Sequence, residues 1–429
     1  MQKSAIMDIL NDWNFWNKEI DTGIKRESYL KKIQTLEKTG QIITITGARR
    51  SGKSTIILQY AKALIESGIE SKNILYINLE EPRYYPELSL KFLQDIYDAY
   101  KEYLEPSRKP HIFLDEVQNI PFWERFVRSL HERKEAMIIV TGSSSKLWSG
   151  EVGTVLTGRT LGITVYPLNF REFLGFHDIE LKNKMDIITK KVQIKKALRE
   201  YINFGGFPLV VLKEEKTKIL QGYFDDIINR DVVYRFKIRM IDKIKTLANY
   251  YLTNISSPIT FNRIRKFLNV PLDTVMRYSY FLNNANLIFF IKKFSYSLKE
   301  QEVNPRKVYC IDTGLRNAVC FNTSTDIGKL YENIVFMKLV MDGYEVYYWK
   351  NKRECDFIVK SENKLKAIQV CYDIEKAKER EVEGLLETLK LLKLSEGVIV
   401  TEEYEDEKRV DDKKIRFVPL WKFLWISDE

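Results

Sequence analysis

The amino-acid sequence predicts an α/β protein of several domains, the first of which is built on a parallel sheet covered by helices. Short β-branched runs alternate with helical patterns over residues 41–170, and a glycine-rich turn follows the first run. The chain of 429 residues is also too long for one ordinary hydrophobic core. Hydrophobic residues make up 45% of it, which is enough to fill two or three cores.

Charge and cysteine content narrow the class of protein further. Lys and Arg number 69 against 59 Asp and Glu, so the formal net charge is +10 at pH 7. This mild excess suits a polyanionic partner, and a surface rich in Lys and Glu is equally typical of thermophile proteins. The four cysteines form no C-x-x-C pair, and no apolar run reaches the length of a membrane span. We therefore expect reduced thiols, a cytoplasmic location and no membrane partner.

The first 240 residues divide by pattern into three parts. Residues 1–40 are expected to be an arm whose clustered aromatic side chains serve packing, and residues 41–170 hold the predicted sheet. From 171 to 240 the pattern is helical and rich in lysine, which is typical of a lid or linker. The predicted strands of the sheet are Gln41–Thr46, Ile74–Leu79, His111–Glu116, Met137–Ser143 and Leu161–Tyr166.

The turn after the first predicted strand satisfies the phosphate-loop pattern G-x-x-x-x-G-K-[ST] from Gly47 to Ser54. Its glycines permit positive φ, so backbone N–H groups can surround a phosphate at the positive end of the following helix. Lys53 would add a charge at the β- and γ-phosphates, and the Ser54 hydroxyl would complete a Mg²⁺ shell. The sequence thus predicts binding of ATP and Mg²⁺. The expected nucleotide contacts come from Gly47, Arg50, Ser51, Gly52, Lys53, Ser54 and Thr55.

An acidic pair ends the third predicted strand. Asp115 would hold Mg²⁺ through its water ligands. Glu116 follows at a position where a carboxylate can polarise the attacking water, the general-base role that separates hydrolysis from binding alone. In an unrelated protein such a pair could simply end a strand, but here it follows a complete phosphate loop at a suitable separation. The pair therefore favours ATP hydrolysis.

One polar segment lies at the tip of the fourth predicted strand, and a second lies in the loop after it. Thr141-Gly142-Ser143-Ser144-Ser145 resembles a sensor that touches the γ-phosphate or its water, with Ser143 as the candidate residue. Arg159 ends the segment Leu156-Thr157-Gly158-Arg159. Because charge develops on the γ-phosphate oxygens during transfer, an arginine from a neighbouring subunit could complete the site, which would require self-association. A surface or sheet-packing role for Arg159 fits the sequence equally well.

Residues 241–320 show the element order of a winged helix. Thr260–Phe267 and Leu272–Asn284 are predicted helices joined by a short turn, and strands at Leu287–Lys293 and Lys307–Ile311 follow around a basic loop. Winged helices bind DNA and also protein, so the fold does not decide between them.

The basic residues of this segment favour contact with the DNA backbone. Arg277 alone is expected to point outward from the second helix, which is too little for reading bases. The wing and the preceding helix should then make the contacts, through Arg263, Arg265, Lys266, Lys299, Arg306 and Lys307.

Taken in order, the motifs resemble those of a known family. They are Gly47–Ser54, Asp115-Glu116-Val117-Gln118, Thr141–Ser144, Leu156–Arg159 with Pro167-Leu168-Asn169-Phe170-Arg171-Glu172-Phe173, and Gly205-Gly206-Phe207-Pro208. The chain is similar to archaeal and bacterial AAA-type ATPases whose C-terminal half carries a winged helix and a domain similar to restriction endonucleases. The resemblance implies a sensor strand between the strands of the phosphate loop and of the acidic pair. It also implies ATP hydrolysis completed between subunits.

Residues 321–429 would then form the endonuclease-like α/β domain. Nucleases of the PD-(D/E)XK type combine a helical Glu, a strand Asp and an acid-x-Lys, because two carboxylates and a carbonyl hold Mg²⁺ while Lys orients the attacking water. Glu332 and Asp356 match the first two elements, and the third reads Gln369-Val370-Cys371. Gln369 can offer a carbonyl oxygen as ligand, whereas Cys371 cannot replace the ammonium.

A substitute lysine could come from the following helix, at Lys376 or Lys378. Without one, the pattern favours a degenerate nuclease fold that binds DNA or protein over an active nuclease. The leading interpretation of the whole chain is a Mg²⁺-dependent ATP hydrolase that works as a motor or switch on DNA. The alternative is a nucleotide-controlled signalling switch whose winged helix binds protein.

Overall fold

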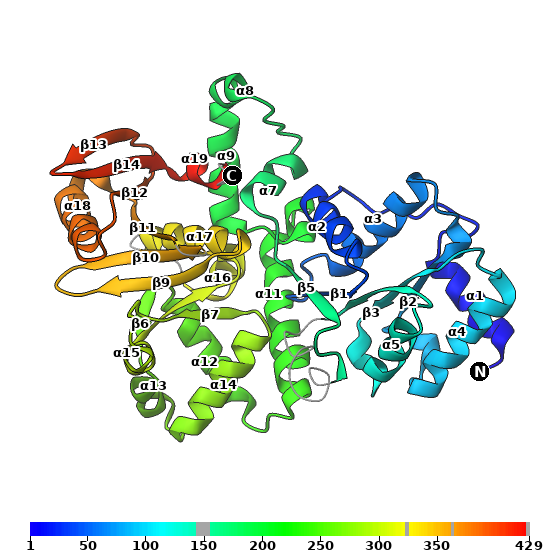
Figure 1. Ribbon diagram of the computed structural model, residues 1–429. Coiled ribbons are helices and arrows are strands. Elements are labelled where there is room, and N and C mark those ends of the chain that lie inside the picture. Colours follow the sequence, from blue (N-terminus) through cyan, green and yellow to red (C-terminus); the bar gives the residue numbers. More distant parts are fainter. Residues whose placement is uncertain (143–154, 322–325, 362–363, 426–429) are drawn as a thin grey trace. The chain divides into compact units, whose positions relative to one another are not determined.

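The computed structural model describes residues 1–142, 155–321, 326–361 and 364–425 (Figure 1), with the backbone alone at 184 and 376–378. These residues form two compact units, Met1–Val165 and Tyr166–Glu429. No helix within the described ranges combines the length and the apolar character that crossing a bilayer requires.

The first unit contains a parallel sheet with the strand order β2-β3-β4-β1-β5. The prediction of a parallel sheet is confirmed, and β4 lies between β1 and β3, the order that the family resemblance implies. The strands are β1 (Ile42–Gly47), β2 (Ile74–Asn78), β3 (His111–Asp115), β4 (Met137–Thr141) and β5 (Thr160–Val165).

Helices cover both faces of this sheet. Successive residues of a strand point to opposite faces, and in these strands both sets of residues are apolar. Ile112 and Leu114 of β3 pack in the cluster that includes residues of α1, α4 and α5. Phe113, between them, packs with residues of α2 and α3. The helices are α1 (Lys3–Trp13), α2 (Glu27–Glu37), α3 (Lys53–Glu66), α4 (Leu90–Leu104) and α5 (Trp123–Glu132), with short 3₁₀ turns at Ser71–Asn73, Pro82–Tyr84 and Val117–Asn119.

The amino-terminal arm is part of the first unit's core. The side chain of Asn14 donates to the carbonyl of Tyr76 at 2.9 Å and accepts from its N–H at 2.7 Å, which extends the hydrogen bonding of β2 at the sheet edge. The indole of Trp16 donates to the carbonyl of Ile74. The clustered aromatic residues of the arm therefore serve packing.

The second unit begins with helices, which are α7 (Phe170–Phe176), α8 (Lys184–Thr189), α9 (Lys191–Phe204), α10 (Pro208–Leu212), α11 (Lys216–Asp226) and a π-helical segment at Ile227–Tyr234. The glycine pair after α9 is fixed by Asp312. One carboxylate oxygen accepts from the N–H of Gly206 at 2.7 Å. A Cβ at Gly205 would lie 1.9 Å from the other oxygen, and its φ is +71°. The pair is thus required by a close approach that ends one helix and redirects the chain.

Residues 241–320 form five helices and an antiparallel sheet with the order β6-β8-β7. A short helix replaces the open basic loop that the sequence predicts between the last two strands. The elements are α12 (Ile241–Thr253), β6 (Ser257–Ile259), α13 (Phe261–Leu268), α14 (Leu272–Asn284), β7 (Ile288–Ile291), α15 (Leu298–Val303), β8 (Arg306–Cys310) and α16 (Thr313–Val319).

The basic residues at the end of that loop are not arranged as predicted. The expectation that Lys307 contacts DNA is wrong, because its side chain is 2% exposed and lies inside the second unit. Arg306 forms an ion pair with Glu302 at 3.0 Å, across one turn from α15.

The last part of the chain is a mixed sheet with the order β13-β14-β12-β11-β10-β9, in which β11, β12 and β14 run parallel. The backbone of Tyr348 in β9 pairs with the residues that directly follow β7. Its N–H donates to Lys292, and its carbonyl accepts from Phe294. The elements are α17 (Ile327–Met341), β9 (Glu345–Lys350), β10 (Glu354–Ser361), β11 (Lys364–Cys371), α18 (Ile374–Leu391), β12 (Glu396–Thr401), β13 (Asp406–Val410), β14 (Lys413–Pro419) and α19 (Leu420–Trp425).

Candidate functional site

The phosphate loop connects the carboxyl end of β1 to the first turn of α3. Gly47, Arg50 and Gly52 have φ values of +142°, +67° and +96°. Backbone that alternates in this way points successive N–H groups into one concavity, the arrangement that binds anions. A Cβ at Gly47 would also lie 2.0 Å from the carbonyl oxygen of Val165 on β5. Glycine is therefore required there by packing as well as by backbone angle.

Lys53 is nearly buried in the first turn of α3, with 4% of its side chain exposed. Its ammonium donates to the carbonyls of Gly47 at 3.3 Å and Ala48 at 3.2 Å, and it lies 3.7 Å from a carboxylate oxygen of Glu116. A cation held on the carbonyls of its own loop is in position to bind a phosphate placed in that loop.

Asp115 is the centre of a network of three hydroxyl groups. Tyr76 donates to one carboxylate oxygen at 2.8 Å, Thr141 donates to the other, and Ser54 adds a third side-chain hydrogen bond. Burial raises the pKa of Asp115, the charge of Glu116 raises it further, and the three hydrogen bonds oppose both effects. A nearby cation would relieve this unfavourable burial of charge. Ser54 and Asp115 thus fit the Mg²⁺ that the fold family implies.

Glu116 has the left-handed backbone angle φ +57°, which is uncommon for a residue other than glycine. Its N–H donates to the Thr141 hydroxyl at 2.9 Å, and Gln118 donates to its carboxylate. Thr141 therefore holds the backbone of Glu116, whereas Gln118 orients its carboxylate, which lies beside Lys53.

Of the other predicted nucleotide contacts, Arg50 and Thr55 are exposed, whereas Ser51 is buried and its hydroxyl donates to Ala48 at 2.8 Å. Ser143 lies outside the described residues. Thr141, two positions earlier on β4, is the sensor-segment residue that meets both acids.

Arg159 is far from the phosphate loop of its own chain. It directly precedes β5, whose first residue pairs with Ile42 at the start of β1, whereas the loop leaves the other end of β1 at Gly47. Those ends are about 17 Å apart for a strand of this length. Arg159 forms an ion pair with Glu132 at 3.1 Å.

Sequence reasoning missed two residues that support the site, Tyr76 beside Asp115 and Arg26 beside the loop. Tyr76 has no motif around it. Arg26 donates to the carbonyl of Ser51 at 2.9 Å, and its own N–H donates to Gln59 at 3.1 Å. One sequence signal for Arg26 was Gln59, a polar residue on the otherwise apolar face of α3. A buried amide needs hydrogen-bond partners, so its position indicates that another segment packs there. Gln59 also donates to two carbonyls of the arm, at Thr22 and Ile24.

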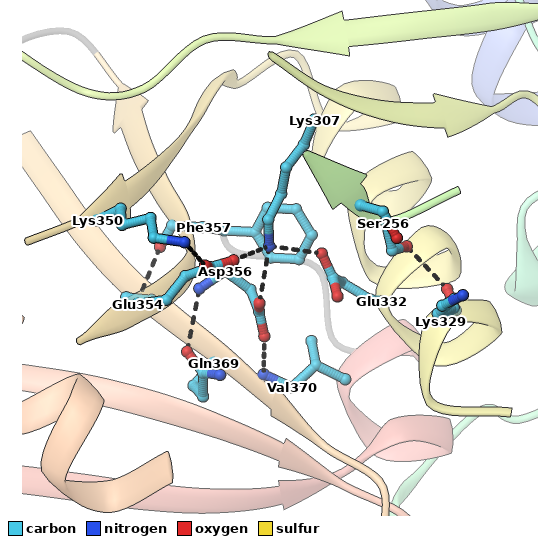
Figure 2. Close-up of polar contacts among 12 residues, drawn as sticks. Ser256, Lys307, Lys329, Glu332, Lys350, Glu354, Asp356, Phe357, Gln369 and Val370 are labelled. Carbon is cyan, nitrogen blue, oxygen red and sulfur yellow. Dashed lines mark hydrogen bonds and ion pairs between the residues drawn. The ribbon is translucent and has the colours of Figure 1, made fainter. Parts of the chain in front are cut away.

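In the second unit the structure brings Glu332 and Asp356 together, and Figure 2 shows that Lys307 lies between them. The Lys307 ammonium is 3.1 Å from Glu332, 2.8 Å from Glu354 and 3.1 Å from Asp356. The Tyr309 hydroxyl also donates to Glu332 at 2.7 Å. Glu354 was not predicted, although it alternates with Asp356 on β10 and so can share a face with it.

The side chain of Gln369 is turned toward the backbone of β10. Its side-chain oxygen accepts from the N–H of Asp356 at 3.0 Å, and its amide group donates to Glu381 of α18. Burial raises the pKa of the Cys371 thiol to about 12, so this side chain stays neutral. The side chains of Lys376 and Lys378 lie outside the described residues. Among those that the structure describes, no three His, Cys, Asp or Glu side chains are placed to hold a metal ion.

Burial and charge shape the titration of this cluster. Burial by itself would lower the pKa of Lys307, but the surrounding acids, Glu332 first, outweigh it and hold the pKa well above its usual value. Burial raises the pKa of Glu332 to about 8, with a further contribution from Asp356 and opposition from Lys307 and Tyr309. A cavity of about 870 Å³ opens beside the cluster and is also lined by Gln369 and Arg380.

The strand order, the phosphate loop and the acidic pair define the first unit as a P-loop ATPase domain of the AAA type. A family described as "AAA domain" matches residues 39–174, and two families described as domains of unknown function match residues 195–326 and 327–423.

The chain belongs to the same family as the "Uncharacterized protein MJ1544" of Methanocaldococcus jannaschii, with 35% identity over 403 residues, 89% of this chain and 88% of that protein. An "Uncharacterized protein" of Haemophilus influenzae is 31% identical over 410 residues, 93% of this chain and 98% of its own length. The Aeropyrum pernix Orc1 protein, solved in complex with DNA, overlaps 70% of this chain and 93% of its own at 13% identity and a TM-score of 0.34, which is too distant to bear on function.

Proposed function

We propose that this protein is a Mg²⁺-dependent ATP hydrolase that works as a DNA-associated motor or switch. The observation that carries the proposal is the meeting of Lys53, Asp115 and Glu116 at the phosphate loop. Lys53 lies 3.7 Å from Glu116, and the neighbouring Asp115 is hydrogen-bonded to Ser54. These are the groups that phosphoryl transfer to water needs in one place.

Each of these residues has a distinct proposed role. Mg²⁺, when bound, would neutralise charge on the phosphate oxygens. Ser54 and Asp115 would hold that ion, and the loop N–H groups and Lys53 would bind the triphosphate. Glu116 would take a proton from the attacking water, since Thr141 holds its backbone and Gln118 orients its carboxylate.

Arg159 is proposed to act on the nucleotide of a neighbouring subunit. It lies too far from its own loop, and its pairing with Glu132 at the surface could be exchanged for a phosphate. Mixing Arg159→Ala with Lys53→Ala subunits should then restore part of the ATP turnover that each variant lacks alone, because some interfaces recover both residues. Steady-state ATPase rates at varied mixing ratios measure this. Rates that never exceed the sum of the two variants would leave Arg159 a surface residue.

The proposed DNA contact lies on α13. Arg263, Arg265 and Lys266 are exposed there, and the burial of Lys307 removes one of the three wing residues that the sequence predicts for this role. Three basic side chains of this kind suit contacts to DNA phosphates and do not require recognition of the nucleotide bases.

ATP turnover should therefore rise on addition of DNA, and DNA affinity should fall steeply with salt because bound counterions are released. Replacing Arg263, Arg265 and Lys266 together by alanine should reduce the slope of log affinity against log salt by about 0.7 to 0.9 per lost phosphate contact. Fluorescence anisotropy with single-stranded, duplex and branched DNA at several salt concentrations measures the slope.

The matched control replaces three exposed basic residues of the first unit, Lys91, Arg108 and Lys109, by alanine. It should leave the slope nearly unchanged. If no DNA form changes the ATPase rate, or if both triple variants lose the same slope, the DNA assignment is wrong.

A nucleotide-controlled switch that binds protein is the second candidate. Exposed apolar side chains favour it, because Phe267 on α13 and Met276 and Tyr280 on α14 are 59%, 47% and 49% exposed. Apolar and aromatic side chains among arginines are typical of protein interfaces. Slow turnover that is indifferent to every DNA form would favour this candidate.

A further inference from the structure

The acidic centre of the second unit already contains a cation. The ammonium of Lys307 lies 3.1, 2.8 and 3.1 Å from oxygens of Glu332, Glu354 and Asp356. An ammonium has three N–H donors and no acceptor, so each of its donors has its own carboxyl group. Figure 2 shows this arrangement, with the lysine entering from β8 and the acids from α17 and β10.

The position of Lys307 is fixed by its backbone. β8 is the central strand of its sheet and pairs with β6 on one side and β7 on the other. Two further contacts connect it to α17, where Tyr309 donates to Glu332, and the side chain of Asn333 bonds both the N–H and the carbonyl of Cys310. The strand that carries Lys307 is therefore held against α17, and withdrawing the ammonium would leave three carboxyl groups without their cation.

An ammonium that contacts all three carboxyl groups competes with a divalent metal for the same oxygens. Mg²⁺ needs oxygen ligands at about 2.1 Å in a nearly octahedral shell. The same oxygens are within about 3 Å of Lys307, so a second cation would meet strong repulsion. Gln369, the third expected ligand, turns its carbonyl to the N–H of Asp356. The residues that the sequence matched to a nuclease site therefore do not fit the metal that such a site requires.

We propose that Lys307 is the resident cation of this centre, which replaces the divalent metal of an endonuclease-like site and joins the segment 241–320 to the terminal sheet. The centre is structural and cuts no DNA. The third nuclease element has Cys371 in place of its lysine. A lysine reaches the centre from β8 instead, and its ammonium takes the place of the metal.

Manganese binding tests this proposal. Mn²⁺ is titrated into nucleotide-free protein and the free ion is followed by electron paramagnetic resonance. The wild-type chain should show weak binding that does not change in Asp356→Asn. Lys307→Met should gain one additional site, about tenfold tighter or more, a difference of about 1.4 kcal/mol. That site should be lost in Lys307→Met with Asp356→Asn. The phosphate loop is the same in all four proteins, so their differences report the terminal centre.

A stoichiometric Mn²⁺ site in the wild-type chain that disappears in Asp356→Asn would overturn the proposal. So would a folded Lys307→Met chain that gains no Mn²⁺ site. If Lys307→Met does not fold, the wild-type and Asp356→Asn titrations still decide, together with plasmid nicking in Mn²⁺, which should be absent in the wild type. Nicking that is lost in Asp356→Asn contradicts the proposal.

Discussion

Replacing Glu116 by glutamine should slow ATP turnover by about 10²- to 10⁴-fold, the usual contribution of a general base. The amide keeps the size of the side chain and can still accept from Gln118, and the backbone bond to Thr141 is unchanged, but the amide cannot take a proton from water. Nucleotide binding should stay within a few-fold of the wild type, because Lys53 and the loop are unchanged. Single-turnover hydrolysis and equilibrium binding of a fluorescent ATP analogue measure the two effects separately.

Lys53→Ala is the contrasting variant, because it should lose binding as well as turnover. Loss of a charge-assisted contact to phosphate costs about 1.5 to 3 kcal/mol, or roughly ten- to a hundredfold in affinity. Glu102→Gln, an exposed residue of α4 away from the loop, controls for the change of charge. A Glu116→Gln rate within tenfold of the wild type would remove Glu116 from the base role.

The phosphate-binding half of the site could be predicted because its residues are local in sequence. Gly47–Ser54 is a single turn, and its pattern fixes both the backbone angles and the charge. The supporting residues could not be predicted in this way. Tyr76 reaches Asp115 only because β2 pairs with β3 in a register that places Tyr76 opposite Phe113. A tyrosine in an apolar strand is otherwise typical of plain packing.

Lys307 was misread for a related reason. A lysine that follows an arginine in a predicted basic loop is expected to be exposed, because lysine is almost never buried without a partner. Its partners Glu332 and Asp356 are 25 and 49 residues away. Their meeting depends on how α17 and β10 pack against β8, and no local pattern carries that information. Comparison of Gln369-Val370-Cys371 with the acid-x-Lys element of nucleases shows that the lysine is missing. Only the fold shows that Lys307 reaches the same centre.

Lys307→Met should destabilise the second unit by about 3 to 5 kcal/mol near pH 8, because it leaves buried carboxyl groups without their cation. The loss should depend on pH in a defined direction. The pKa of Glu332 is raised from 4.5 to about 8, so its contribution to stability is full below pH 4.5 and is lost as pH rises through 8. Removing Lys307 takes away a charge that lowers this pKa. The deficit of the variant should therefore shrink at pH 5, where Glu332 is protonated.

Urea unfolding at pH 5 and pH 8 measures the effect, with hydrogen exchange of β8 and β10 peptides to separate the second unit from the first. Lys338→Met is the matched control, since Lys338 of α17 is paired with Asp342 nearer the surface. It should cost about 1 kcal/mol or less. Adding Asp356→Asn to Lys307→Met should recover part of the loss, because fewer buried acids then lack a cation. A deficit that is equal at both pH values would mean that Lys307 stabilises the unit by packing alone.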